Sequence, residues 1–205
     1  AVILPFEEGF YRERGMEVEY VGHPLLDTVP RDLNREGILR EMGLAGRSPV
    51  LGLLPGSRTE EVRNLLPVMI RAAEALRERH PDLICLLPLA STIPADLVHS
   101  FTTLSSLPVR VLSGDIYRLL SVCDLAFVAS GTATLETAIM GVPMVILYRV
   151  SPLSFWLAKK VIRVPHIGLV NLVAGEGIVP ELIQHDVTPE RLAEEGLSIL
   201  ESRQR

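Results

Sequence analysis

The sequence predicts an α/β fold: a Rossmann-like open parallel sheet with helices on both faces. Short apolar runs alternate with segments of helical periodicity at the intervals of βαβ units. Apolar residues make up 48% of the 205 residues, so the chain can bury a large core, and because only 5% are aromatic that core is aliphatic. Two of the apolar runs end in glycine-bearing polar loops, which is typical of strands that end at a ligand site.

Each element follows from its local pattern. Pro67 interrupts the first long helical segment, so a short first turn and then a main helix to about Arg79 are expected. Asp115 stands near the positive end of a short helix, and Gly141 closes a later one. The predicted strands are residues 49–58 (a strand that ends in a glycine turn), 82–89, 109–112, 124–130 and 143–148. The predicted helices are residues 62–79, a segment from about 94, 115–123, 132–141, 155–162, 179–185 and 188–203.

The handedness of helical crossovers leaves few topologies for such a chain, and the commonest has strand order 3-2-1-4-5. In that order the first and fourth strands are neighbours at the switch point of the sheet, where a crevice opens. These two strands end in the loops "PGSR" and "ASGTAT". The sequence therefore predicts a ligand site formed by both loops.

The loop from Ser130 through Gly131 and Thr132 to Thr134 is made of small residues, which let a ligand approach the backbone. Its hydroxyls can cap the following helix or donate to ligand oxygens, and the helix start suits a phosphate. Glu136 could accept two hydrogen bonds from a ribose diol. By spacing alone, a simple helix cap with a dipole-complementary Glu136 is an equally good interpretation.

In the other loop, Gly56 and Ser57 form a tight turn and Arg58 offers a planar fork for a diphosphate. The alternative is that Arg58 pairs with Glu61 along the helix surface. The loop has no Walker A spacing, and the chain has neither G-x-G-x-x-G nor G-x-S-x-G, which argues against a dinucleotide oxidoreductase and a serine nucleophile.

The formal net charge of −5 argues against nucleic-acid binding. Cys85 and Cys123 lie far apart in apolar runs and are expected to be buried free thiols, as in a reducing cytoplasm. No apolar run reaches the roughly 20 residues of a membrane span, and no cluster of ligands suggests a metal site. Residues 155–163 combine aromatic and basic residues, which could contact an anionic membrane surface or could form an ordinary amphipathic helix.

The motifs "VGHPLLD", "LPGSRTEEVRNLLP", "ASGTATLETAIMGVPMVILYR", "FWLAKKVIRV" and "LVNLVAG" together resemble the lipid-A-disaccharide synthase family, in order, from residue 1 to about 192. The resemblance implies the C-terminal, donor-binding domain of a GT-B fold. It implies transfer of 2,3-diacylglucosamine from its UDP donor to 2,3-diacylglucosamine 1-phosphate, with inversion and without a metal or other cofactor. It also implies a cytoplasmic enzyme of Gram-negative bacteria, peripheral to the inner membrane.

Carried over by motif, Gly56, Ser57 and Arg58 would meet the donor diphosphate together with the loop of residues 130–134, and Glu136 would hold the ribose. Arg149 and Asn171 would face the donor sugar or the cleft, with Arg58 and Asn171 as the catalytic candidates. His23 would be a hinge or cleft-edge residue. The general base is expected outside this chain, on the N-terminal domain.

The resemblance divides the chain into a remnant of the N-terminal GT-B domain (residues 1–28), a linker (29–48) and a UDP-sugar-binding domain (49–205). The chain starts without Met in what reads as the middle of a strand, so we expect it to be part of a longer protein. Alone it should bind UDP weakly and not turn over. Two alternatives remain open: a related enzyme such as a UDP-N-acetylglucosamine 2-epimerase, and a non-catalytic nucleotide-binding module.

Overall fold

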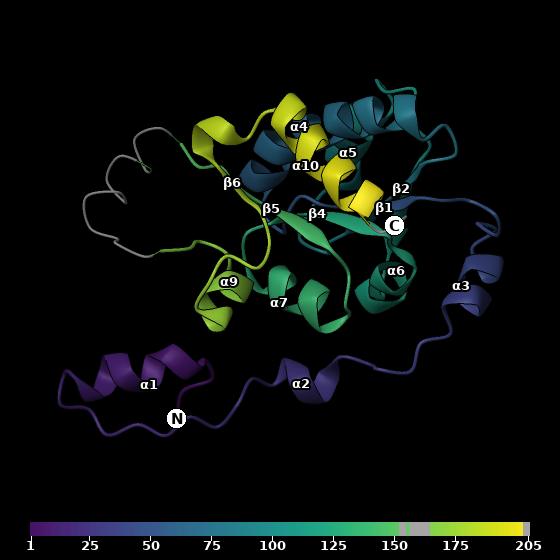
Figure 1. The fold of residues 1–205 in the computed structure, drawn as a ribbon. Coiled ribbons are helices and arrows are strands. Elements are labelled where there is room, and N and C mark those ends of the chain that lie inside the picture. The colour runs from purple at the N-terminus through teal and green to yellow at the C-terminus, as the bar shows by residue number, and fades with distance from the viewer. Residues whose placement is uncertain (152–154, 156–164, 203–205) are drawn as a thin grey trace.

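The computed structural model describes residues 1–151, 155 and 165–202 (Figure 1). A parallel six-stranded sheet lies at its centre, in the order β3-β2-β1-β4-β5-β6. The predicted fold class and the predicted order of the first five strands are confirmed. The strands are β1 (Val50–Leu54), β2 (Ile84–Leu89), β3 (Val109–Ser113), β4 (Leu125–Ala129), β5 (Met144–Tyr148) and β6 (Glu181–Ile183).

Helices cover both faces of the sheet (Figure 1). Side chains alternate along each strand, so Leu53 of β1 packs in one core cluster and Leu54 in the other. One cluster is covered by α4 (Thr59–Arg79), α5 (Ala95–Thr102) and α10 (Pro189–Ser202), and the other by α3 (Arg35–Glu41), α6 (Ile116–Val122), α7 (Thr132–Ile139) and α9 (Leu169–Ala174). Both β1 and β4 are buried along their whole length, so the loops that follow them reach the surface only at the carboxyl edge of the sheet.

The expected break at Pro67 is wrong, because α4 runs continuously from Thr59 to Arg79 with Pro67 inside it. Residues such as Leu65, Leu66 and Met69 are buried on both sides of the proline. Burying this apolar face outweighs the roughly 3 kcal/mol that a proline costs inside a helix.

The predicted helix over residues 179–185 is also wrong. Residues Glu181–Ile183 form β6, which pairs in parallel with β5, and a short 3-10 turn (Gln184–Asp186) follows. Gln184 has a positive φ of 53°, which does not suit the interior of a helix, and residues Glu181–Ile183 pair instead with the open edge of β5. The predicted helix over residues 155–162 lies outside the described residues except for Phe155, whereas the predicted C-terminal helix is confirmed as α10.

The N-terminal segment contains α1 (Pro5–Arg12) and α2 (Leu25–Thr28) and lies beside α7 and α9, away from the sheet (Figure 1). The sequence of residues 1–28 predicts a strand, a short helix and a second strand. The helix is present, but in place of the two strands the structure has a parallel bridge between Val2 and Tyr20. None of the residues of α1 is buried.

Helix α3, by contrast, is attached to the sheet. Arg35 pairs with Asp124 at 2.7 Å, and Asp124 accepts a hydrogen bond from the Val50 amide of β1.

Both cysteines are buried free thiols, as predicted. Burial raises the pKa of Cys85 to about 12 and also raises the pKa of Cys123, so both remain protonated at neutral pH. Among the helices that the structure describes, none combines the length and the apolar character needed to cross a bilayer.

Candidate functional site

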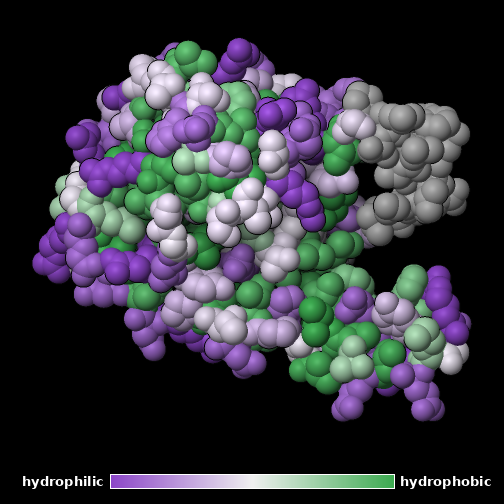
Figure 2. All heavy atoms as spheres, turned by 180° about the vertical axis from the view of Figure 1, so that it is seen from behind, coloured by the Kyte–Doolittle hydropathy of each residue, from purple (hydrophilic) through white to green (hydrophobic). Residues whose placement is uncertain are grey.

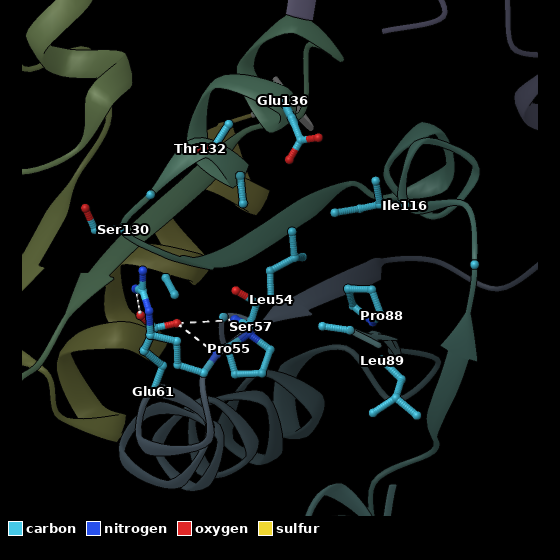
Figure 3. Close-up of a pocket in the computed structure, with 17 residues that line it drawn as sticks. Leu54, Pro55, Ser57, Glu61, Pro88, Leu89, Ile116, Ser130, Thr132 and Glu136 are labelled. Atoms are coloured by element: carbon cyan, nitrogen blue, oxygen red, sulfur yellow. Dashed lines mark hydrogen bonds and ion pairs between the residues drawn. The ribbon is translucent and has the colours of Figure 1, made fainter. Parts of the chain in front are cut away.

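A pocket of about 410 Å³ opens at the carboxyl ends of the strands (Figure 3). Its walls come from the residues that follow β1, β2, β3 and β4. The parallel register pairs Leu54 with Val128, so β1 and β4 end side by side and their two loops face the same space. The pocket therefore lies at the predicted switch point of the sheet.

Seven of the ten predicted site residues line this one pocket: Gly56, Ser57, Arg58, Ser130, Gly131, Thr132 and Glu136. They come from two loops more than 70 residues apart in the sequence. Figure 3 shows Ser57 on one side of the opening and Thr132 and Glu136 on the other. The structure thus brings together the two loops on which the sequence hypothesis depends.

The start of α7 forms one wall. Thr132 and Ala133 are its first residues and both line the pocket, so backbone N–H groups that lack partners within the helix lie at the opening. The Ser130 hydroxyl donates to the Ile167 carbonyl at 3.1 Å, and no side chain caps the helix. A side-chain cap, one of the two interpretations that the sequence left open, is therefore not formed, and the N–H groups of this helix end can donate to the acceptor atoms of a ligand.

Glu136 lies one turn into α7, where its carboxylate is held by a residue from another helix. The Tyr117 hydroxyl donates to Glu136 Oε1 at 3.0 Å. Partial burial and the adjacent carboxylate raise the pKa of Tyr117, so the phenol keeps its proton and remains a donor. Helix α2 packs against α7, which connects the N-terminal segment with this wall.

On the opposite wall, Arg58 precedes α4 and its side chain is 81% exposed. Its Nη1 lies 2.6 Å from Glu61 Oε1, so the pairing that the sequence left as an alternative is present in the structure. The Thr92 hydroxyl donates to the Ser57 carbonyl at 2.6 Å and fixes this turn from the loop after β2. Among the described residues of the wall, Arg58 is the only cation, and Glu61 and Glu136 are the carboxylates.

The other three predicted residues lie off the pocket wall. Thr134 is fully buried and donates to the Gly131 carbonyl at 2.8 Å, so its hydroxyl cannot point at a ligand. Arg149 is exposed just after β5.

Asn171 is fully buried in α9. Its Nδ2 donates to the Val179 carbonyl and to Glu181 Oε1, and its Oδ1 accepts from the amides of Ile178 and Val179. All four hydrogen-bonding positions of the side-chain amide are thus used within the chain. In this structure Asn171 holds the segment before β6 against α9.

Sequence reasoning did not identify Tyr117 or Thr92, and it considered Glu61 only as a surface partner of Arg58. Tyr117 and Glu136 belong to different helices, so no spacing along the chain could relate them.

Among the described residues, no group of three or more His, Cys, Asp and Glu side chains is placed to hold a metal ion. The aromatic and basic segment around residues 156–163 lies outside the described part of the chain.

Comparison with known proteins gives one family. The family model described as Lipid-A-disaccharide synthetase matches residues 1–205. A lipid-A-disaccharide synthase of Nitrosococcus oceani is 44% identical over 205 residues, which are all of this chain and 53% of the relative. One of Geobacter sulfurreducens is 47% identical over 195 residues, 95% of this chain and 51% of the relative. The chain thus spans about half the length of these relatives.

Solved structures share the fold at low identity. A UDP-N-acetylglucosamine 2-epimerase of Methanocaldococcus jannaschii, solved with UDP-N-acetylglucosamine and UDP, superposes with a TM-score of 0.64 at 13% identity. The match covers 96% of this chain and 52% of the epimerase chain. At this low identity the superposition supports the Rossmann-like α/β architecture, and it says nothing about the side chains of the pocket.

Proposed function

Because this chain belongs to the lipid-A-disaccharide synthase family, we propose that it provides the donor-binding half of a glycosyltransferase of lipid A biosynthesis. The observation that carries the proposal is the single pocket lined by both predicted loops. In the reaction we propose, 2,3-diacylglucosamine passes from its UDP donor to 2,3-diacylglucosamine 1-phosphate with inversion at the anomeric carbon, and UDP leaves.

The diphosphate would lie between Arg58 and the first turn of α7. Backbone N–H groups at a helix start carry partial positive charge, and a guanidinium can pair with phosphate oxygens in a planar fork. Both donors line the same cavity from opposite sides. In the transfer step, negative charge grows on the UDP leaving group, so donors that are fixed before the reaction lower its barrier.

The ribose would be held by Glu136. Its Oε1 already accepts from Tyr117, which fixes the direction of the carboxylate and leaves oxygen lone pairs for a diol. Tyr117 would then be a positioning residue, acting on the ribose through Glu136. The 410 Å³ volume is within the range of small-molecule sites, which fits a nucleoside diphosphate.

The N-terminal segment supports the division into domains that we propose. Its exposed large apolar side chains are Ile3, Phe6, Phe10, Met16, Tyr20 and Val21. Figure 2 shows hydrophobic surface on this projecting segment. So many exposed apolar groups on one short segment indicate a surface that another part covers. We assign residues 1–28 to the end of the N-terminal domain, 29–48 to the linker and 49–205 to the donor domain, with the general base and acceptor surface on that N-terminal domain.

Disaccharide formation tests this function. The 205-residue chain is compared with a chimera in which it replaces the matching half of the Nitrosococcus oceani relative, using the two diacylated sugars as substrates. We expect UDP release and disaccharide from the chimera and none from the chain alone. Product from the isolated chain would contradict the half-enzyme role, and a chimera that folds and binds UDP but forms no disaccharide would contradict the proposed reaction.

A further inference from the structure

The turn after β1 already holds a carboxylate of its own chain. Glu61 Oε2 accepts from the backbone amides of Ser57 at 3.2 Å and Arg58 at 3.3 Å (dashed lines in Figure 3). The other oxygen, Oε1, pairs with the Arg58 guanidinium at 2.6 Å. One anionic group thus engages both the amides and the cation on this side of the pocket.

Gly56 makes this arrangement possible. Its φ is +105°, and a Cβ placed there would lie 2.2 Å from Glu61 Oε2. The carboxylate therefore lies directly against the turn, at the pocket wall, and its side chain is only 26% exposed. The same contact completes a capping box at the start of α4, as Glu7 does at the start of α1; at α4 the carboxylate in addition lies on the pocket wall and pairs with Arg58.

The charges on the pocket wall give this contact a consequence for the ligand. Arg58 contributes one positive charge, and Glu61 and Glu136 contribute two negative charges among the described lining residues. A diphosphate that entered beside an intact Arg58–Glu61 pair would meet a cation that is already neutralised. Repulsion from Glu61 would add to that cost, and solvent would weaken this repulsion in part because the Arg58 side chain is 81% exposed.

We propose that Glu61 is a built-in competitor of the donor diphosphate, holding Arg58 and the turn amides in the empty site and giving up Arg58 when the diphosphate binds. The inference rests on the proposed function, because it takes a diphosphate as the ligand of this pocket. Glu61 thereby keeps the turn ordered before binding and lowers the affinity for UDP, which also favours release of UDP as a product.

The test is an isothermal calorimetric titration of the 205-residue chain and of its Glu61→Gln variant, each with UDP and with uridine. Glutamine keeps an oxygen for the turn amides but removes the charge that competes for Arg58. We expect UDP to bind about fivefold more tightly to the variant at low salt, with the gain shrinking as salt screens the charges. Uridine has no phosphate, and its affinity should change less than twofold.

Glu60→Gln is the matched control, because Glu60 carries the same charge one position earlier, is 78% exposed and does not line the pocket. It should leave UDP affinity within twofold. Unchanged or weaker UDP binding by a folded Glu61→Gln variant would overturn the inference. If Arg58→Ala weakens UDP binding in the same series, the proposed site survives that result. If Arg58→Ala has no effect, the proposed site and the inference both fail.

Discussion

Replacing Arg58 with alanine is expected to weaken UDP binding about 30-fold. Hydrogen bonds to charged groups contribute about 1.5–3 kcal/mol each, and Arg58 is the only cation among the described residues of the pocket wall. The side chain is 81% exposed, so its loss should leave the fold intact. Calorimetric titration of UDP, with the circular dichroism spectrum as a folding check, measures both effects.

Two comparisons make the Arg58 result specific to the diphosphate. Arg58→Lys keeps the charge but loses the planar fork, so its affinity should lie between those of the wild type and the alanine variant. Uridine should bind the wild type and Arg58→Ala equally. Equal UDP affinity in Arg58→Ala and the wild type would contradict the proposed diphosphate site.

Replacing Asn171 with alanine is expected to lower the free energy of unfolding by about 3 kcal/mol. The substitution removes four hydrogen bonds and leaves the Val179 carbonyl, the amides of Ile178 and Val179, and Glu181 Oε1 without this partner. Each buried polar group left unsatisfied costs about 1–3 kcal/mol, and relaxation or water recovers part of the total. Denaturant unfolding measures the difference.

Val173→Ala is the control for Asn171, since Val173 lies in the same helix and is 39% exposed. It should change stability by less than about 1 kcal/mol. UDP affinity should be unchanged in both variants under conditions where they are folded. A loss of UDP binding by Asn171→Ala without a loss of stability would restore the catalytic or donor-facing role that its motif implied.

The sheet could be predicted from the sequence because each central strand is a continuous apolar run with a polar turn behind it. Leu51, Leu53 and Leu54 are all buried, as are Leu125 and Phe127. Segments this apolar on both faces are not expected at the protein surface. The pairing of β1 with β4 follows from the handedness of the crossovers. The meeting of the two loops at one pocket was predictable for the same reason.

Other features depend on contacts that no local pattern encodes. Strand β6 has three residues and exists because β5 offers it an open edge, and Pro67 stays inside α4 because the helix buries residues on both sides of it. The motif around Asn171 suggested a ligand, whereas its partners lie seven to ten residues later, in the segment that leads into β6 and at the first residue of that strand, whose path the sequence does not reveal. The sequence also left open whether Arg58 pairs with Glu61 or lines the crevice. In the structure Arg58 pairs with Glu61 and also lines the pocket.

The most direct test of the account is an amide NMR titration of the 205-residue chain with UDP. We expect saturable shifts concentrated at Ser57 and Arg58 and at Gly131, Thr132 and Ala133, on the two sides of the pocket. Asn171 and its neighbours should shift little. Shifts that avoid both loops, or that gather on the exposed apolar residues of the N-terminal segment, would contradict the claim that these loops together bind the donor diphosphate.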